Sequence, residues 1–375
     1  MTRGHDGGRH VLFLNRRDMT HPEAGGSEVF LERTAAGLLD LGWRVTVGSE
    51  RHPGSAADEE RDGVRYLRRG QGLGLYTRSA LAHLTRRFDR VDVVVDVQNG
   101  MPFCSPLVTR VPVVNLVHHV HREVWPIVLP PRAAALGWLA ESRLAPRVYR
   151  RHPYVAVSAA TRDELVGLGV DGSRITVVHN GTDVRPQPGV RRAARPTVLA
   201  VTRLVPHKQL DVALRAIAAL RADLPDVRLV VAGTGYAESE LRALVADLGL
   251  EDHVELLGWV DEDTKHRLMA QAWVMAMPSL KEGWGLAVIE AAAHGTPSVA
   301  FRNAGGLAES IVDGETGLLV DGGEDAFTAA LRVLLTGADL RERMRGAARS
   351  HATGFTWEAT AKALHGVLED AGGWV

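Results

Sequence analysis

Two glutamates, Glu282 and Glu290, stand eight positions apart in the segment Glu-Gly-Trp-Gly-Leu-Ala-Val-Ile-Glu. An apolar run ending at Met277 precedes them and an apolar helical pattern follows, which predicts a strand, a glycine-containing turn and a helix. Backbone N–H groups at such a helix start bind phosphate. A carboxylate beside phosphate is unfavourable unless it binds a neutral group, such as a sugar hydroxyl. The pair therefore indicates a sugar nucleotide, although the same spacing without its context is more typical of a surface turn.

Two cations follow another predicted strand. Arg203 and Lys208 come directly after the apolar residues 197–201, and charge-assisted hydrogen bonds from two such groups can hold one diphosphate. Only four of the 44 basic residues are lysines, so a lysine within a candidate site is informative. The alternative for this pair is the solvated start of a helix.

Composition narrows the class of protein. At ~150 residues per domain, the 375 residues suggest two domains. A net charge of −1 does not favour a nucleic acid or an anionic membrane as partner. The single cysteine, Cys104, excludes an internal disulfide and suits the reducing cytoplasm, where we expect the protein. The polar N-terminus does not resemble a signal peptide, and no run of 18 apolar residues predicts a membrane span.

Apolar strand-like runs alternate with helical patterns, which is typical of parallel sheets with crossover helices. The predicted strands cover residues 10–14, 44–48, 91–95, 112–117, 154–157 and 175–178, and then 197–201, 227–231, 253–257, 273–277, 297–301 and 317–320. The predicted helices cover 27–41, 76–88 and 132–150, and then 208–223, 237–248, 285–294, 324–336, 339–350 and 357–371. The pattern lapses at 184–196, a stretch rich in proline and arginine that we interpret as a linker.

The motifs in this order resemble the retaining GT-B glycosyltransferases of family four. Glu282–Glu290 resembles the E-x7-E motif of that family, and residues 201–208 resemble its basic segment. Residues 177–183 and 355–357 are similar to the segments where the chain leaves and re-enters the first domain. The resemblance covers nearly the whole chain. It implies an α/β GT-B fold: two doubly wound Rossmann-like domains, 1–186 and 187–355, facing a cleft, with a helix over 356–375 crossing back to the first.

The resemblance also implies site residues. The catalytic candidates are His118, Glu282, Arg203 and Lys208, and the donor-binding candidates are Gly25, Gly26, Arg203, Lys208, Trp259, Val260, Glu282, Gly283, Trp284, Gly285, Leu286 and Glu290. Arg203, Lys208 and the helix start at 284–286 would stabilise the leaving diphosphate. Glu290 would accept hydrogen bonds from ribose and Glu282 from the sugar.

Several of these positions have a structural alternative. Trp259 is a packing residue if it does not help to hold the nucleobase, and Gly25 and Gly26 form an ordinary turn capped by Ser27 if they do not approach the donor. The segment 304–306, Ala-Gly-Gly, is equally a second set of phosphate donors or a plain turn.

Histidines cluster after the predicted strand 112–117. His118 aligns with a histidine that ends the equivalent strand in the family, where a neutral imidazole can bind a sugar or acceptor hydroxyl. We expect His119 and His121 to matter less, because neither has a family counterpart. The pattern His-His-x-His lacks the helical spacing of a metal site.

We expect no metal and no bound cofactor, with the nucleoside-diphosphate sugar as co-substrate. The acidic run 261–263 stands directly before a predicted helix, where aspartate and glutamate act as caps.

The predicted function is retaining transfer of a sugar from a nucleoside-diphosphate sugar to a hydroxyl of a small metabolite. The alternatives on the same fold are a nucleotide-sugar epimerase, a phosphorylase, or an enzyme with a lipid acceptor, which the arginine-rich residues 143–151 could contact. A dinucleotide oxidoreductase is disfavoured, because residues 233–235, Gly-Thr-Gly, lack the third glycine of the fingerprint. A non-catalytic sugar-nucleotide sensor would keep the glutamates without turnover. The sequence predicts no stable membrane insertion and leaves the oligomeric state open.

Overall fold

The computed structural model describes residues 8–84, 90–183 and 185–374. The chain divides into two compact units, the first comprising Met1–Gly181 and Trp357–Val375 and the second Thr182–Thr356. The sequence predicts domain boundaries after residues 186 and 355, and the structure divides after residues 181 and 356. Part of the predicted helix over 76–88 lies outside the described residues.

The elements of the first unit alternate as predicted. In chain order they are β1 (His10–Leu14), α1 (Gly26–Asp40), β2 (Arg44–Ser49), β3 (Asp58–Arg61), β4 (Val64–Arg68), α2 (Leu73–Leu84), β5 (Val93–Gln98), β6 (Val113–Val117), α3 (Trp125–Val128), α4 (Pro131–Leu139), a π-helical turn (Ala140–Leu144), α5 (Ala145–Val148), β7 (Tyr154–Ala156), α6 (Ala159–Gly167), β8 (Ile175–Val177) and α14 (Trp357–Gly372).

Within the described ranges, these strands form an eight-stranded sheet in the order β3-β4-β2-β1-β5-β6-β7-β8. Neighbouring strands pair in parallel except β3 and β4, which form an antiparallel edge. The residues of β1, β5 and β6 are buried throughout, as expected for strands covered on both faces. The strand order reverses between β1 and β5, and open α/β sheets bind ligands beside such a reversal.

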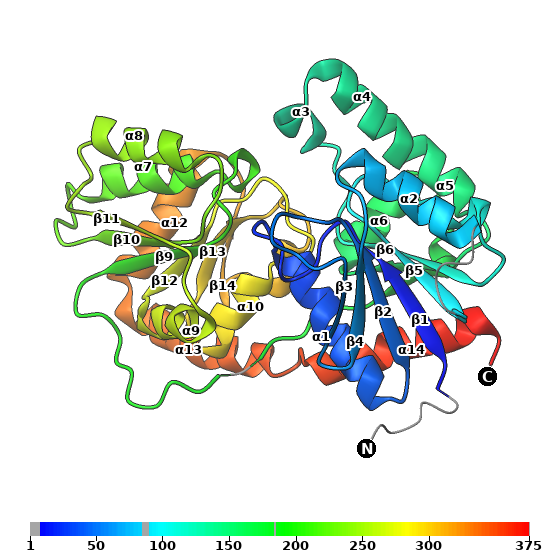
Figure 1. The fold of residues 1–375 in the computed structure, drawn as a ribbon. Coiled ribbons are helices and arrows are strands. Elements are labelled where there is room, and N and C mark those ends of the chain that lie inside the picture. Colours follow the sequence, from blue (N-terminus) through cyan, green and yellow to red (C-terminus); the bar gives the residue numbers. More distant parts are fainter. Residues whose placement is uncertain (1–7, 85–89, 184, 375) are drawn as a thin grey trace. The chain divides into compact units, whose positions relative to one another are not determined.

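The last helix, α14, belongs to the first unit, as predicted. It packs against α1, and Figure 1 shows the two helices side by side. A Cβ at Gly37 of α1 would stand 2.4 Å from the Cβ of Ala361, so glycine is what permits this close approach. Trp43 Nε1 donates to His365 Nδ1 at 2.9 Å, which anchors α14 further along.

The second unit repeats the alternation. Its elements are β9 (Thr197–Val201), α7 (Leu210–Leu220), β10 (Arg228–Ala232), α8 (Glu238–Asp247), β11 (Val254–Gly258), α9 (Glu262–Gln271), β12 (Val274–Met277), α10 (Leu286–Ala293), β13 (Ser298–Phe301), α11 (Leu307–Ser310), β14 (Gly317–Val320), α12 (Glu324–Thr336) and α13 (Ala338–Ala352).

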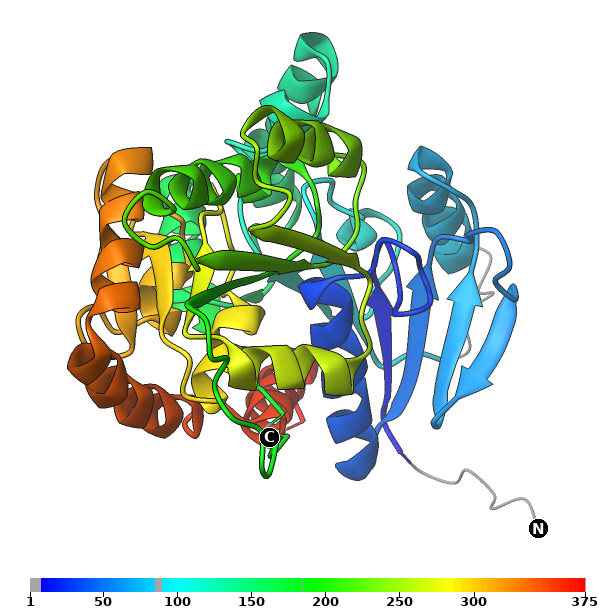
Figure 2. The same cartoon turned by 90° about the vertical axis from the view of Figure 1, so that its left-hand side faces the viewer.

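In the described part of this unit, the strands form a six-stranded parallel sheet in the order β11-β10-β9-β12-β13-β14. Figures 1 and 2 show α7 and α8 on one face and α9 on the other. Contacts of α12 with α7, and of α10 with α9 and α13, complete the two helical layers. The strand order reverses between β9 and β12, so the loops that follow these two strands flank the expected binding crevice.

The structure adds three details that the sequence analysis did not predict. The hairpin of β3 and β4 was not predicted, because β3 reads Asp-Glu-Glu-Arg, a composition that strands avoid except at charged edges. The predicted helix over 132–150 is present as a continuous helical run over 131–148. A π-helical turn separates α4 from α5 within it, directly before Pro146, which cannot donate a backbone hydrogen bond. The linker is bound to the second unit, where Ala193 N donates to Gln271 O at 2.9 Å.

None of the helices among the described residues is both long and apolar enough to cross a membrane.

Candidate active site

An ion pair joins the loops that follow β9 and β12, the two strands at the order reversal of the second unit. Lys208 ends a short 3-10 turn after β9, and Glu282 lies in the loop after β12. The Lys208 Nζ donates to Glu282 Oε1 at 2.6 Å, and Ser279 Oγ donates to the same oxygen at 2.7 Å. Burial alone would raise the pKa of Glu282, but Lys208 and Ser279 outweigh it and the pKa is lowered. The structure thus brings two predicted catalytic residues into contact as a charged pair.

Glycines explain how the loop that carries Arg203 is held. A Cβ at Gly233 would stand 1.9 Å from Thr202 O, and one at Gly235 would stand 2.2 Å from Leu204 O. Because Gly233 and Gly235 have no side chains, the loop after β10 packs directly on the loop after β9. Leu204 N donates to Thr234 O at 2.9 Å. The Gly-Thr-Gly segment therefore has a packing role here. The contribution of Arg203 to diphosphate binding stays a prediction.

The loop before α10 is built from close backbone contacts. Gly285 has a φ of +89° and precedes Leu286, the first residue of α10. Glu282 N donates to Ala304 O and Gly306 N donates to Glu282 O, both at 3.0 Å. A Cβ at Gly306 would stand 2.1 Å from Gly283 O. The Ala-Gly-Gly segment thus supports the glutamate loop, and the first N–H groups of α10 have no intrahelical partner.

The Trp284 side chain of this loop is buried and lies against Phe355, with ring centroids 4.9 Å apart. Donor binding by Trp284 stays a prediction, and it would use the backbone of this residue.

Glu290 lies in α10 and contacts α9. Lys265 Nζ donates to Glu290 Oε1 at 2.8 Å and lies 3.0 Å from Glu262 Oε2. Burial raises the pKa of Glu290, and the Lys265 ammonium only partly offsets this effect. Lys265 was not predicted as a site residue. The scarcity of lysine in this chain could have drawn attention to Lys265. The spacing of Lys265 from Glu290 along the chain gave no indication of their contact.

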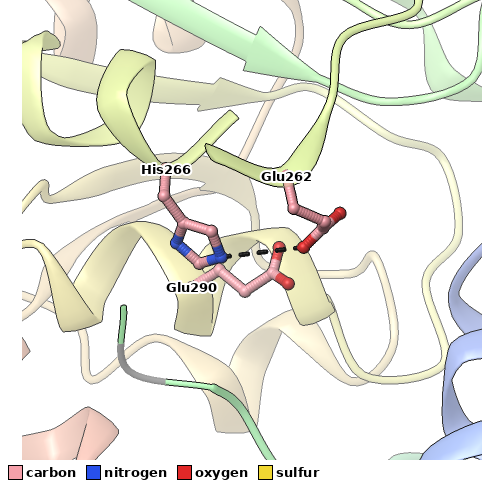
Figure 3. A group of neighbouring side chains, drawn as sticks. All are labelled: Glu262, His266 and Glu290. Atoms are coloured by element: carbon pink, nitrogen blue, oxygen red, sulfur yellow. Dashed lines mark ion pairs between the residues drawn. The ribbon is translucent and has the colours of Figure 1, made fainter. Parts of the chain in front are cut away.

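Figure 3 shows Glu262, His266 and Glu290 converging, with one ligand atom from each within 4.8 Å of the others. Three such groups could hold a metal ion. However, the Lys265 ammonium already bridges the two carboxylates. Burial and, to a lesser extent, the Lys265 ammonium lower the pKa of His266 to about 4, so the imidazole is neutral at pH 7. A divalent ion would have to displace this lysine.

The acidic run before α9 is a helix cap, as predicted. Asp261 is the N-cap residue, and its carboxylate accepts a hydrogen bond from Thr264 N at 2.7 Å. Asp263 is exposed and faces Arg185 at 3.3 Å.

Sugar transfer should persist in excess EDTA, because Lys208, Arg203 and the start of α10 can neutralise the leaving diphosphate. Steady-state rates with and without chelator test this. Complete loss of activity that Mg²⁺ or Mn²⁺ restores would contradict the prediction and would assign Glu262, His266 and Glu290 to a metal.

Trp259 follows β11 at the carboxyl edge of the same sheet. Its side chain is 77% exposed, so the packing alternative for this residue is wrong. Val260 is partly buried next to it. Binding of the nucleobase at these two residues stays a prediction.

In the first unit, α1 begins at Gly26, two residues earlier than an N-cap at Ser27 would require. Gly25 is the N-cap residue, and its N–H donates to Glu28 Oε2 at 2.7 Å, so the predicted cap at Ser27 is wrong. A Cβ at Gly26 would meet no atom within 4 Å. The loop before Gly25 is anchored by Asp18, which accepts hydrogen bonds from Arg68 Nε at 2.7 Å and Ser49 Oγ at 2.6 Å. A donor-binding role for the two glycines stays a prediction.

His118 follows β6 at the carboxyl edge of the first sheet and is 6% exposed. Its ring lies edge-on to Phe30, with centroids 5.3 Å apart. Burial and, to a lesser extent, His121 together lower the pKa of His118 to about 3. Among the described residues, His118 Nε2 is buried without a hydrogen-bond partner, which is an uncommon state for a buried polar atom. The imidazole is therefore neutral, as the sequence suggested.

Comparison with known proteins gives the family. Residues 184–351 match the model described as "Glycosyl transferases group 1", and residues 24–185 match the model "Glycosyltransferase Family 4". The chain belongs to this family of GT-B glycosyltransferases.

Among curated relatives, a D-inositol 3-phosphate glycosyltransferase of Nocardia farcinica is 39% identical over 229 residues, covering 56% of this chain and 51% of the relative. One of Mycobacterium avium is 35% identical over 297 residues, covering 65% and 68%. The chain thus spans about half the length of the first relative.

Two solved structures share the fold. Sucrose-phosphate synthase from Thermosynechococcus elongatus gives a TM-score of 0.82 at 19% identity, covering 96% of this chain and 98% of the other. Anabaena HepE, solved in complex with UDP and glucose, gives 0.76 at 21% identity, covering 96% and 100%.

Proposed function

We propose that this chain is a retaining glycosyltransferase that moves a sugar from a nucleoside-diphosphate sugar to a hydroxyl of a small metabolite. The observation that carries the proposal is the Lys208–Glu282 pair at the strand reversal of the second unit. It provides a cation for phosphate and a carboxylate for sugar hydroxyls at one place. The UDP and glucose named for Anabaena HepE and the inositol phosphate named for the curated relatives support the choice of substrates.

In the transfer, the bond between the anomeric carbon and the diphosphate oxygen breaks, and its electron pair leaves with the nucleoside diphosphate. The acceptor oxygen forms the new bond to the anomeric carbon, and its proton passes to the departing phosphate oxygen. Lys208, Arg203 and the first N–H groups of α10 stabilise the charge on the leaving diphosphate. Glu282 accepts from the sugar hydroxyls while the diphosphate occupies Lys208. Glu290 accepts hydrogen bonds from the ribose hydroxyls. Until ribose binds, the Lys265 ammonium compensates the charge of this buried carboxylate. His118 binds a hydroxyl as a neutral acceptor.

Nucleoside diphosphates should stabilise the protein against heat, since a ligand at 100 Kd adds about 2.7 kcal/mol to the free energy of unfolding. Thermal shifts with UDP-, GDP- and dTDP-glucose will identify the nucleobase. In Glu290→Ala we expect about tenfold weaker binding, because hydrogen bonds from ribose to a carboxylate are lost. At the same ligand concentration the stabilisation then falls to about 1.4 kcal/mol.

The exposed Glu255→Ala is the control, as Glu255 is a half-exposed residue of the same unit that pairs with Arg228. Equal stabilisation of wild type and Glu290→Ala would contradict the ribose assignment. Incubation with UDP-glucose alone identifies an epimerase, which converts the donor without any acceptor. Incubation with UDP-glucose and each acceptor in turn identifies a sensor, which leaves the donor unchanged in every case.

One observation favours a lipid acceptor as the second candidate. Apolar side chains of α3, α4 and the following turn are more than a third exposed, namely Ile127, Val128, Leu129, Leu136, Leu139 and Leu144. Arg143 lies in the same π-helical turn as Leu144 and Arg147 lies in α5, and apolar residues beside cations suit a membrane surface. Co-sedimentation with vesicles that contain anionic lipid distinguishes this candidate from the small-metabolite enzyme.

A further inference from the structure

A buried carboxylate in the first unit has no part in the mechanism above. Glu141 is 1% exposed and lies in the π-helical turn Ala140–Leu144, which continues α4. Three donors face it. His121 N lies 3.1 Å from both carboxylate oxygens, His121 Nδ1 lies 3.0 Å from Oε1, and Trp125 Nε1 lies 2.8 Å from Oε2. π-Helical turns are rare and occur frequently at functional sites.

The indole that donates to Glu141 is held by two glycines. A Cβ at Gly100 would stand 2.5 Å from Trp125 Cζ2, and a Cβ at Gly137 would stand 2.9 Å from Trp125 Cε3. The absence of these side chains makes room for the ring on both sides. Gly137 stands one turn before Glu141 in the same helical segment. The position of the carboxylate is therefore fixed from two directions, by its own turn and by Trp125.

This arrangement selects one tautomer of His121. A backbone N–H and an indole N–H can only donate, so Glu141 accepts as an ionised carboxylate. The His121 Nδ1 must then carry a proton, and in the neutral tautomer with that proton Nε2 is an acceptor. The His121 side chain keeps 14% exposure, whereas that of Glu141 keeps 1%. The other titratable groups around this ring are His119, stacked on it at 4.1 Å, and His118.

We propose that His121 accepts a hydrogen bond from a hydroxyl of the acceptor substrate through Nε2, and that Glu141 is the residue that positions it. The inference rests on the proposed function. His121 follows His118 by three residues at the carboxyl edge of the first sheet, so it extends the predicted hydroxyl-binding edge. The ranking of His121 below His118 came from family resemblance alone, whereas its carboxylate partner lies 20 residues away and has no sequence signature.

The first test requires no substrate. In protein labelled with ¹⁵N-histidine, NMR should show His121 protonated on Nδ1 at neutral pH. In Glu141→Gln an amide N–H₂ can donate to Nδ1, so the proton should move to Nε2. A wild-type His121 protonated on Nε2 would overturn the proposal.

The second test uses UDP-glucose and D-inositol 3-phosphate, or the pair that the donor screen identifies. His121→Ala and Glu141→Gln should each raise the acceptor KM about tenfold, the value for one lost hydrogen bond with its partner left unpaired. The donor KM should change little. His119→Gln is the matched control, because its ring stacks on His121 without the carboxylate, and it should stay within about twofold of wild type.

The outcomes separate the two levels of inference. A wild type that transfers sugar while His121→Ala keeps its acceptor KM contradicts this inference alone. A wild type that transfers to no hydroxyl contradicts the proposed function and this inference with it. If Glu141→Gln does not fold, the tautomer of wild-type His121 and the acceptor KM of His121→Ala still test the proposal.

Discussion

Replacing Lys208 with alanine is expected to lower sugar transfer by about 10²–10³-fold, the usual cost of removing a group that stabilises charge in the transition state. The expected loss has two parts. The leaving diphosphate loses its cation, and the Glu282 carboxylate, now held only by Ser279, faces the phosphate without compensation. UDP affinity, measured by calorimetric titration, should fall by about 10–10²-fold, since a charge-assisted hydrogen bond is lost.

Lys362→Ala is the matched control, because Lys362 is an exposed lysine of α14 that pairs with Glu358 one turn away. It should transfer sugar at the wild-type rate. If Lys208→Ala transfers sugar at a rate within a few-fold of wild type, the ion pair is not part of the active site. Glu282→Gln, combined with Lys208→Ala in a double-mutant cycle, would show whether the two side chains act as a unit.

His118→Ala is expected to lower transfer by at least about 10²-fold, the low end for a positioned acid–base group. UDP affinity should change much less, because Lys208 and Glu290 belong to the second unit. The control is His152→Ala, a half-buried histidine just before β7, at the opposite edge of the first sheet. Near wild-type transfer by His118→Ala would mean that the acceptor binds elsewhere.

The pH dependence of stability gives this variant a second readout. The pKa of His118 is lowered from 6.5 to about 3 by burial, so the group binds a proton in the unfolded chain at a higher pH than in the folded one. Its contribution to stability is therefore present above pH 6.5 and is lost as the pH falls toward 3. His118→Ala should lose less stability over that window than the wild type. Equal losses in thermal unfolding between pH 7 and pH 4 would contradict a buried, neutral His118.

Local patterns in the sequence were sufficient for much of this protein. Alternating apolar runs predict parallel strands, and parallel strands bring their carboxyl ends to one edge of a sheet. For this reason Lys208 and Glu282, each placed after a predicted strand, could be assigned to one site before their contact was known. The helix cap at Asp261 was predictable for a similar reason, since the hydrogen bond reaches only to Thr264.

Other features depend on which elements pack together, and the tertiary structure alone decided them. Lys265 meets Glu290 because α9 packs on α10, and His121 meets Glu141 because a π-helical turn and two glycines direct that carboxylate. The charged strand β3 exists because β4 offers it an unpaired edge. In each case the partner lies outside the local window, and the burial of a charge depends on a contact that spacing along the chain does not encode.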